Sequence, residues 1–476
     1  AHADDQDDVA GLDLGHVRRR AEAGGDAAGD EAGDVERDVV VALDRASGKV
    51  VWQKTARREV PHEGRHATNS YASASPITDG ERLYASFGSR GLYCYDLQGK
   101  LLWEKDLGDM QTRNGFGEGS SPTLAGNVLI VPWDQEGGAS FVVGAWNVTV
   151  TASDGKGGKF YILGRDGGVW RFEPVSGNLK QIIWPQDYVG LKSNDLKTFG
   201  FVCDDTGRLW ITVNQRVVAK PVVLNECGIY RTTGFDAEGD PIAPQPWLQT
   251  SYPWGIGPYN HGVSDIRFGR DGLLYVSSGS RTDAGETGVF SHLGKMGEVE
   301  TTGVMWRLDP QSAAPKIEII ARGIRNAYSF NWDGAGNLFT VSNGPDAHAP
   351  EEMDPIVPPK PGEAPRHHGF PYQMGDAPAA HRWYEHTMVP PPPPNPDYVL
   401  PVLNLGPAGI MDGKPTSTFN AHTSPTGLTW LGADWPASVR NGFLVARIGS
   451  FLAGPAEGEE HGFDVLHLRL ERRADG

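Results

Sequence analysis

The stretch Ala42-Leu-Asp-Arg-Ala-Ser-Gly-Lys-Val-Val-Trp52 returns further along the chain as Tyr95-Asp-Leu-Gln-Gly-Lys-Leu-Leu-Trp103. A weaker third copy reads Phe172-Glu-Pro-Val-Ser-Gly-Asn-Leu179. Each copy places a glycine-containing turn after an acidic residue, and in the first two copies an apolar strand then ends on tryptophan. Trp52 and Trp103 are 51 residues apart, which is close to the roughly 40–50 residues of one four-stranded propeller blade. The repeat therefore predicts blades of short antiparallel strands, with the tryptophans wedged between blades.

The second half of the chain repeats a different pattern. An Asp/Gly turn followed by leucine and an aromatic residue occurs at 204–210, 269–275 and 333–339. Strands with alternating side chains give each blade two apolar faces, which are buried only when blades stack on one another. Both patterns predict an all-β protein, a β-propeller with six to eight four-stranded antiparallel blades.

The composition agrees with this fold and excludes some functions. The 62 glycines and 35 prolines favour many tight turns, and the net charge of -17 argues against binding to nucleic acid phosphates. The three cysteines, Cys94, Cys203 and Cys227, are too few for a disulfide framework. No apolar stretch approaches the ~20 residues of a membrane span.

The organisation along the chain is predicted from these patterns. Residues 1–37 are biased in composition, and we expect them to be disordered or to form a short helix near 17–23. Residues 38–185 hold two to three blades, which are too few to close a propeller alone. Residues 186–476 hold the second type of blade, with an extended proline-rich loop at 346–401. A last blade is expected to be missing after residue 470.

Six short motifs follow one another in the second half, and in this order they resemble the glucose/sorbosone dehydrogenase family over residues ~195–470. No single motif is specific by itself. The six motifs are Tyr259-Asn-His-Gly-Val-Ser-Asp-Ile-Arg-Phe-Gly-Arg-Asp-Gly-Leu-Leu-Tyr275, Gly323-Ile-Arg-Asn326, Ser342-Asn-Gly-Pro-Asp346 with Glu351-Glu352, His367-His-Gly-Phe-Pro-Tyr372, Ser424-Pro-Thr-Gly-Leu-Thr-Trp430 and Arg440-Asn-Gly-Phe-Leu-Val445. The segment before them resembles the repeats of quinoprotein-type propellers.

The resemblance implies a quinoprotein oxidoreductase that removes a hydride from a sugar or polyol to pyrroloquinoline quinone (PQQ), with Ca²⁺ at the cofactor. It implies a general base at His261, since imidazole titrates near neutral pH. Carried over position by position, the cofactor would bind Arg325, Asn326 and Asn343. The metal would bind Gly344, Pro345, Glu351 and Glu352, because Ca²⁺ prefers hard oxygen ligands. The family also implies a small-molecule substrate, an external electron acceptor and a periplasmic or secreted location.

Plainer interpretations of the same residues stay open. His261 could be an ordinary loop histidine. Arg325 and Asn326 could instead cap a strand and bind backbone carbonyls. Glu351-Glu352 could lie in a solvated loop. The histidines at 348, 367, 368, 381 and 386 lack the spacing of a metal site. Two other functions are a non-catalytic propeller that binds protein or glycan through its rim loops, and a lactonase-type hydrolase, for which no metal-binding set is evident.

Overall fold

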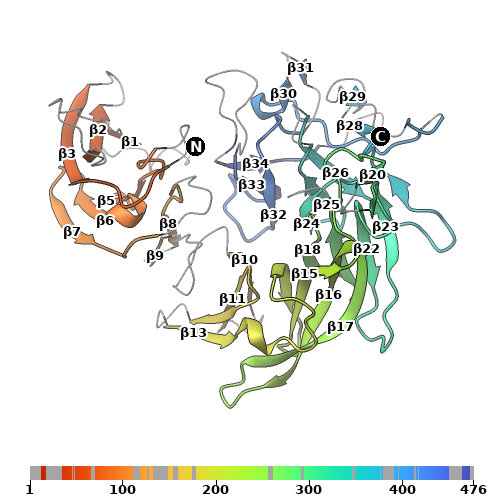
Figure 1. Cartoon of the computed structure of the whole chain (residues 1–476). Helices are drawn as coiled ribbons and strands as arrows, with labels where there is room; N and C mark the ends of the chain where they lie inside the picture. The colour runs from red at the N-terminus through yellow and green to blue at the C-terminus, as the bar shows by residue number, and fades with distance from the viewer. Residues whose placement is uncertain are drawn as a thin grey trace. The chain divides into compact units, whose positions relative to one another are not determined.

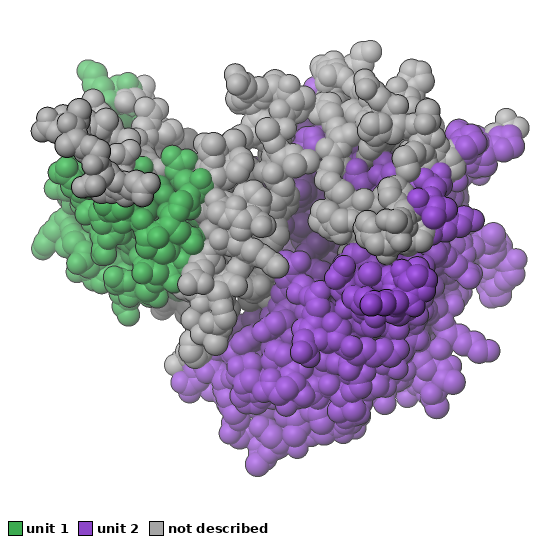
Figure 2. All heavy atoms as spheres, viewed as in Figure 1, with its two compact units in different colours: residues 1–148 green, residues 149–476 purple. Residues whose placement is uncertain are grey.

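The computed structural model divides the chain into two compact units, residues 1–148 and 149–476, which we describe separately (Figure 2). The structure describes residues 12–17, 35–44, 47, 49–65, 70–110, 118–125, 128–131, 148–153, 159–173, 178–255, 261–290, 294–345, 349–375, 377–378, 391–394, 396–411, 414–415, 418–449, 462 and 464–471.

The N-terminal unit consists of antiparallel sheets (Figure 1). The first sheet has the order β1-β2-β3, the second β4-β5-β6-β7, and β8 pairs with β9. Their bounds are β1 Leu12–Val17, β2 Glu36–Asp44, β3 Val50–Glu59, β4 Ile77–Thr78, β5 Arg82–Ser86, β6 Leu92–Asp96, β7 Leu101–Lys105, β8 Thr123–Ala125 and β9 Val128–Ile130, with the 3-10 turn η1 at Gly88–Arg90.

Trp52 shows how the repeat joins two of these sheets. It lies on β3, and its indole N–H donates to the carbonyl of Leu97 at 3.0 Å, in the turn after β6. A Cβ built on Gly99 in the same turn would come within 2.8 Å of the indole ring, so only glycine lets the ring pack there. This turn has a positive φ of 81° at Gly99. The predicted wedge between blades is confirmed for Trp52, whereas Trp103 is 37% exposed.

The C-terminal unit contains five consecutive blade sheets, ordered β10-β11-β12-β13, β14-β15-β16-β17, β18-β19-β22-β23-β27, β24-β25-β26 and β32-β33-β34. Their bounds are β10 Val148–Ser153, which begins one residue before the division between the units, β11 Phe160–Gly164, β12 Val169–Glu173, β13 Asn178–Ile183, β14 Leu196–Cys203, β15 Leu209–Ala219, β16 Val222–Phe235, β17 Pro241–Pro253, β18 Val263–Phe268, β19 Leu274–Ser278, β22 Val304–Leu308, β23 Glu318–Arg322, β24 Ala327–Trp332, β25 Leu338–Ser342, β26 Glu352–Ile356, β27 Arg366–His367, β32 Pro425–Leu431, β33 Gly442–Arg447 and β34 Asp464–Leu468.

Short hairpins and 3-10 turns complete the unit. They are β20 Val289–Phe290 with β21 Gly294–Lys295, β28 Gln373–Met374 with β29 Ala377–Pro378, β30 Ile410–Met411 with β31 Lys414–Pro415, and the 3-10 turns η3 Pro185–Asp187 and η5 Pro407–Gly409. Within the described ranges there is no α-helix, and no helix that could cross a membrane.

The hydrophobic cores lie between successive blades. One cluster joins β11–β13 to β14–β16, and the next joins β15–β17 to β18, β19 and β22. Two further clusters join the third blade to β24–β26 and β24–β26 to β32–β33. Leu209, Leu274 and Leu338, which the sequence pattern aligns, are buried in these clusters at 0–3% exposure. The prediction of an all-β propeller with antiparallel blades is confirmed; the described blade sheets of this unit have three to five strands, and only β27 pairs in parallel, with β23.

Two details differ from the expectations. Residues 12–17 form β1, paired with β2, so this part of the biased segment is neither disordered nor helical; most of the expected helix near 17–23 lies outside the described residues. Within the proline-rich stretch, residues 352–356 form β26 instead of loop, and the two-residue strands β27, β28 and β29 also lie there. Among the described strands β26 pairs with β25 alone, so it lies at an edge of the sheet, where a proline such as Pro355 is tolerated.

Candidate active site at one rim of the C-terminal unit

The predicted site residues gather where strands of two neighbouring blades begin or end. The inner strands β18 and β24 start at Val263 and Ala327, and their antiparallel partners β19 and β25 end at Ser278 and Ser342. The start of one strand and the end of its antiparallel neighbour lie at the same edge of a sheet. The loops before β18 and β24 and after β19 and β25 therefore share one rim.

His261 is held at this rim by Ser280. Its backbone N–H donates to the Ser280 carbonyl at 3.1 Å, and its ring Nδ1 lies 3.0 Å from the same carbonyl and 3.1 Å from the Ser280 hydroxyl. A carbonyl only accepts, so Nδ1 carries the proton and Nε2 carries the lone pair. Burial, reinforced by the charge of Arg325, lowers the pKa of His261 to about 3, and the bond to Ser280 opposes this only in part. The ring is thus neutral, with Nε2 as its basic atom.

Asn326 lies beside His261, with Gly279 between them. A Cβ built on Gly279 would come within 2.5 Å of the His261 Cβ and 3.1 Å of the Asn326 Oδ1. The Asn326 side chain is 5% exposed, and its Oδ1 has no hydrogen-bond partner among the described residues. The Asn326 carbonyl accepts from the Asn343 N–H at 3.2 Å. The Asn343 Oδ1 is also buried without a partner in the described part of the chain.

Arg325 is 2% exposed and is fixed by the surrounding loops. Its Nε donates to the Asp283 carbonyl at 2.7 Å, its Nη1 to the Asn343 carbonyl at 3.1 Å, and its Nη2 to the Asp283 carboxylate at 2.5 Å. The Arg325 carbonyl in turn accepts from the Ser280 N–H at 2.6 Å. Two of these contacts are the bonds to backbone carbonyls that the alternative interpretation of Arg325 expects. Together the contacts hold the positive charge of Arg325 next to His261.

Glu351 joins two rim loops. Its carboxylate accepts from the Gly344 N–H at 2.9 Å, and the nearby backbone of His422 and Ser424 also lowers its pKa. His422 and Ser424 have positive φ values of 61° and 47°, which side chains other than glycine rarely adopt. Burial raises the pKa of Glu351 to about 7, although the Gly344 N–H and the Arg325 charge pull it down. Gly344 and Pro345 are themselves buried.

Glu352 faces away from this cluster, because successive side chains on a strand point to opposite faces. Its Oε1 accepts from the Gly375 N–H at 2.5 Å. Burial, together with the charge of Asp354, raises the pKa of Glu352 well above its usual range. Glu351 and Glu352 are 4% and 1% exposed, so the alternative of a solvated loop is wrong for both.

The histidine-rich stretch is only partly described. The residues at 348, 381 and 386 lie outside the described residues. His367 packs against Tyr398, with ring centroids 5.1 Å apart, and His368 Nδ1 lies 3.4 Å from the Asp354 carboxylate. These contacts are those of packed, hydrogen-bonded side chains.

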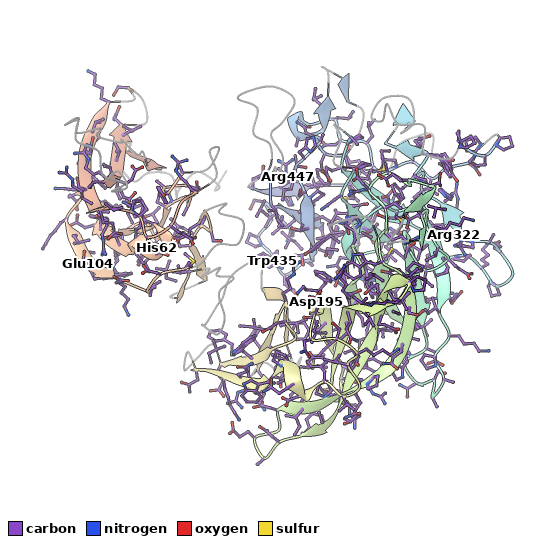
Figure 3. All side chains as sticks on the ribbon, in the orientation of Figure 1. His62, Glu104, Asp195, Arg322, Trp435 and Arg447 are labelled. Carbon is purple, nitrogen blue, oxygen red and sulfur yellow. The ribbon has the colours of Figure 1, made fainter. Side chains whose placement is uncertain are left out.

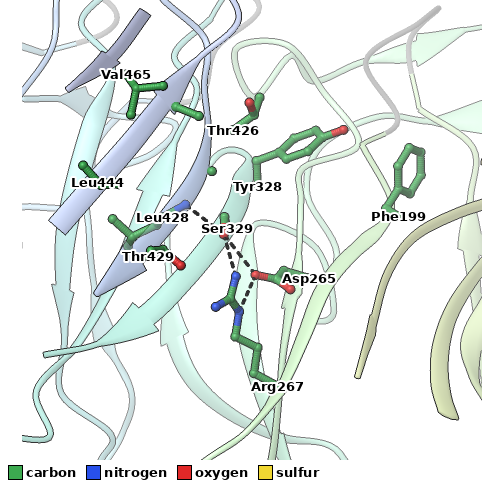
Figure 4. A pocket seen from close by; sticks show the side chains of 12 residues that line it. Phe199, Asp265, Arg267, Tyr328, Ser329, Thr426, Leu428, Thr429, Leu444 and Val465 are labelled. Carbon is green, nitrogen blue, oxygen red and sulfur yellow. Dashed lines mark hydrogen bonds and ion pairs between the residues drawn. The ribbon is translucent and has the colours of Figure 1, made fainter. Parts of the chain in front are cut away.

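A separate cavity of about 320 Å³ lies along the inner strands β14, β18, β24 and β32 (Figure 4). The polar groups that line it bind one another. Arg267 Nε and the Ser329 hydroxyl both donate to the Asp265 carboxylate, at 2.9 and 3.1 Å. None of the eight predicted site residues lines this cavity. We therefore take the rim cluster, and not the cavity, as the candidate active site.

Sequence reasoning missed the residues that position the cluster, namely Gly279, Ser280 and Asp283. For Gly279 and Ser280 the repeated sequence contains a signal. Residues 276–280 read Val-Ser-Ser-Gly-Ser, and residues 341–345 read Val-Ser-Asn-Gly-Pro. When the two segments are aligned, Gly279-Ser280 occupy the positions of Gly344-Pro345.

Two family models match the chain. Residues 253–408 match glucose/sorbosone dehydrogenase, and residues 36–187 match the outer membrane protein assembly factor BamB. The first match contains all eight predicted site residues. A search of curated proteins finds no match.

Several solved structures are similar to the chain. The PQQ-bound aldose sugar dehydrogenase of Streptomyces coelicolor has 18% identity and a TM-score of 0.40, covering 68% of this chain and 82% of its own. A glucose dehydrogenase has 12% identity and a TM-score of 0.42, with 66% and 79% coverage. The PQQ domain of pyranose dehydrogenase from Coprinopsis cinerea has 13% identity and a TM-score of 0.41, with 69% and 77% coverage. At these values the likenesses carry no functional argument.

Proposed function

Because the chain carries a glucose/sorbosone dehydrogenase segment at residues 253–408, we propose that it is a quinoprotein oxidoreductase that oxidises a hydroxyl-bearing carbon of a sugar or polyol. The observation that supports this most is the position of His261, which has a fixed tautomer and stands beside the buried amide of Asn326. The proposal includes an external electron acceptor and a periplasmic or secreted location, as the sequence resemblance implies.

His261 serves as the general base in this proposal. Its Nδ1–H is bound to the Ser280 carbonyl, so Nε2 is the atom that takes the proton of the substrate hydroxyl. The low pKa keeps Nε2 unprotonated at neutral pH. The same low pKa makes Nε2 a weak base. Proton transfer therefore requires that binding of substrate and cofactor raise the pKa of His261. Ser280 holds the ring in one orientation throughout.

The buried oxygens at the rim fit a bound quinone and Ca²⁺. Leaving a buried acceptor without a partner costs about 1–3 kcal/mol, and the Oδ1 atoms of Asn326 and Asn343 have no partner among the residues that the structure describes. A cofactor donor or a hard cation would satisfy such oxygens. When bound, PQQ accepts the hydride and Ca²⁺ stabilises negative charge on its oxygens.

The individual roles follow from the contacts. Arg325, Asn326 and Asn343 would bind the cofactor, with Arg325 contributing chiefly a fixed charge because its guanidinium already holds Asp283. The carbonyls of Gly344 and Pro345 and the Glu351 carboxylate are the proposed metal ligands. Glu352 fits that role less well: its Oε1 binds the Gly375 N–H, and its Oε2, buried without a partner among the described residues, lies on the opposite side of the strand from Glu351.

Reconstitution tests the proposed function. The chain is loaded with PQQ and Ca²⁺ and assayed by dye reduction against a panel of aldoses and polyols. We expect turnover that falls about 100-fold or more in His261→Ala, the range for loss of a general base. His467→Ala is the matched control, because His467 bonds the Val439 carbonyl on another blade. Wild-type protein without turnover on any substrate, or equal rates for the two variants, would contradict the proposal.

A further inference from the structure

A second group of potential ligands lies in the N-terminal unit, in the part that matches the assembly-factor model. One ligand atom each from His62, Glu63 and Glu118 lies within 4.8 Å of the other two; Figure 3 labels His62. We propose that these three side chains bind one divalent transition-metal ion, with the ligand chemistry of Zn²⁺. The site is built from different residues than the rim cluster and does not depend on the proposed oxidoreductase function.

The surroundings of His62 select one ring nitrogen as the ligand. Its Nε2 lies 2.6 Å from the Met110 carbonyl, so Nε2 carries the proton and donates it. Nδ1 then carries the lone pair. Metal-binding histidines usually donate their other ring N–H to a carbonyl or carboxylate, which fixes the ring and its tautomer. The Asp109 carboxylate lies 3.9 Å from Nδ1, on the side where a cation would sit.

Glu118 is oriented in the same way. Its Oε2 accepts from the Ser89 N–H at 2.5 Å, and its Oε1 accepts from the Ser89 hydroxyl. The Ser89 hydroxyl also accepts from the Met110 N–H at 2.6 Å. Ser89 therefore connects the support of Glu118 to that of His62 through Met110. Hydrogen-bond partners that orient the ligand side chains in this way are typical of metal sites in proteins.

Glu63 completes the group. Its backbone carbonyl accepts from the Tyr71 hydroxyl at 2.9 Å, which fixes the chain next to His62. The site thus combines one imidazole nitrogen with two carboxylates.

The ligand types decide which ion fits. Ca²⁺ and Mg²⁺ take all-oxygen sites, whereas an imidazole with carboxylates suits Zn²⁺ and its neighbours in the first transition row. Ligand atoms around tetrahedral Zn²⁺ are about 3.4 Å apart. Small side-chain movements would therefore bring the three ligand atoms from within 4.8 Å of one another to this distance. Three protein ligands leave a fourth position for water or for Asp109.

The test is a Zn²⁺ titration of the full chain after removal of metal with a chelator, using a chromophoric chelator as competitor. We expect one bound Zn²⁺ whose affinity falls at least about 100-fold in His62→Ala and at least about 10-fold in Glu118→Gln. Ser89→Ala, which removes only the supporting hydroxyl, should weaken binding about 10-fold. With Co²⁺ in place of Zn²⁺, the visible absorption of a low-symmetry N/O site should appear in wild type and vanish in His62→Ala.

Two controls separate this site from the rim. Glu351→Gln and His467→Ala should leave Zn²⁺ affinity unchanged, and circular dichroism should show that each variant is folded. Glu118→Gln keeps an oxygen that can accept from Ser89, so it retains the local structure. The proposal is overturned if wild type binds no Zn²⁺ in the micromolar range, if folded His62→Ala and Glu118→Gln bind like wild type, or if binding is lost only in Glu351→Gln.

Discussion

At the scale of single residues, the charge state of His261 depends on its surroundings. The ring is desolvated and lies near a fixed guanidinium, and both effects disfavour the protonated form. Its bond to a carbonyl determines which nitrogen is basic. A histidine in this setting stays neutral across the physiological range, which is the state that a proton acceptor requires.

The titration of His261 can be measured by NMR on ring-labelled protein. We expect the His261 ring to remain neutral down to pH 5, and Arg325→Gln to raise its pKa by removing the nearby charge. In the unfolded chain the ring should titrate near 6.5. A His261 pKa above 6 in the folded wild type would contradict this description.

The low pKa of His261 also makes the free energy of unfolding depend on pH. The folded pKa is depressed, so between about pH 6.5 and 3 the unfolded state binds more protons than the folded state. The contribution of His261 to the free energy of unfolding is therefore present above pH 6.5 and is lost as pH falls toward 3. His261→Asn should reduce the pH dependence of stability in that window.

At this scale the sequence motifs selected residues that lie near one another, but the contacts between them were not predicted. The motifs selected His261, Arg325 and Asn326, which the structure places around Ser280 and Gly279. They could not predict that Asp283 holds Arg325, because that pair joins a loop of one blade to the next and depends on blade stacking. Nor could they predict that Glu352 faces Gly375, since that follows from the register of β26.

At the scale of elements, close backbone packing holds the strands of one blade together, and apolar cores hold successive blades together. Gly228 on β16 faces Gln249 on β17. A Cβ at Gly228 would come within 1.9 Å of the Leu248 carbonyl oxygen on the neighbouring strand. Backbone atoms cannot move aside as a flexible side chain can, so the glycine sets how closely the two strands approach.

Gly228→Ala should therefore destabilise the second blade of the C-terminal unit. We expect a loss of about 1–3 kcal/mol in the free energy of unfolding, the usual cost of overpacking, measured by urea denaturation. Gly234→Ala on the same strand is the matched control, because its Cβ would lie 3.7 Å from Ile242 Cγ1. Equal unfolding midpoints for the two variants would show that the close approach at Gly228 has no cost.

Strand patterns were predictable where an Asp/Gly turn precedes a leucine, and all three such leucines are buried. β26 was not predictable because its sequence Glu-Met-Asp-Pro-Ile carries a proline and acidic residues, which are typical of loops. It forms because its partner β25 is already fixed between two cores and offers a free edge.

At the scale of the whole molecule, two repeat types follow one another along the chain. The match to the assembly-factor family ends at residue 187, whereas the structural division lies at 148–149. The blade β10–β13 thus carries the first repeat type but packs with the C-terminal unit through Ile182 and Ile183. Repeat type follows local sequence, and unit membership follows which apolar faces meet.

Binding of PQQ tests the central claim, that the rim of the C-terminal unit is a quinone site. The measurement is an equilibrium titration of the full chain with PQQ in the presence of Ca²⁺, followed by quenching of tryptophan fluorescence. We predict saturable binding of one PQQ, weakened at least 10-fold in Asn326→Leu, which removes the buried amide, and unchanged in His467→Ala. No saturable binding by folded wild-type protein, or the same affinity in Asn326→Leu, would contradict the account.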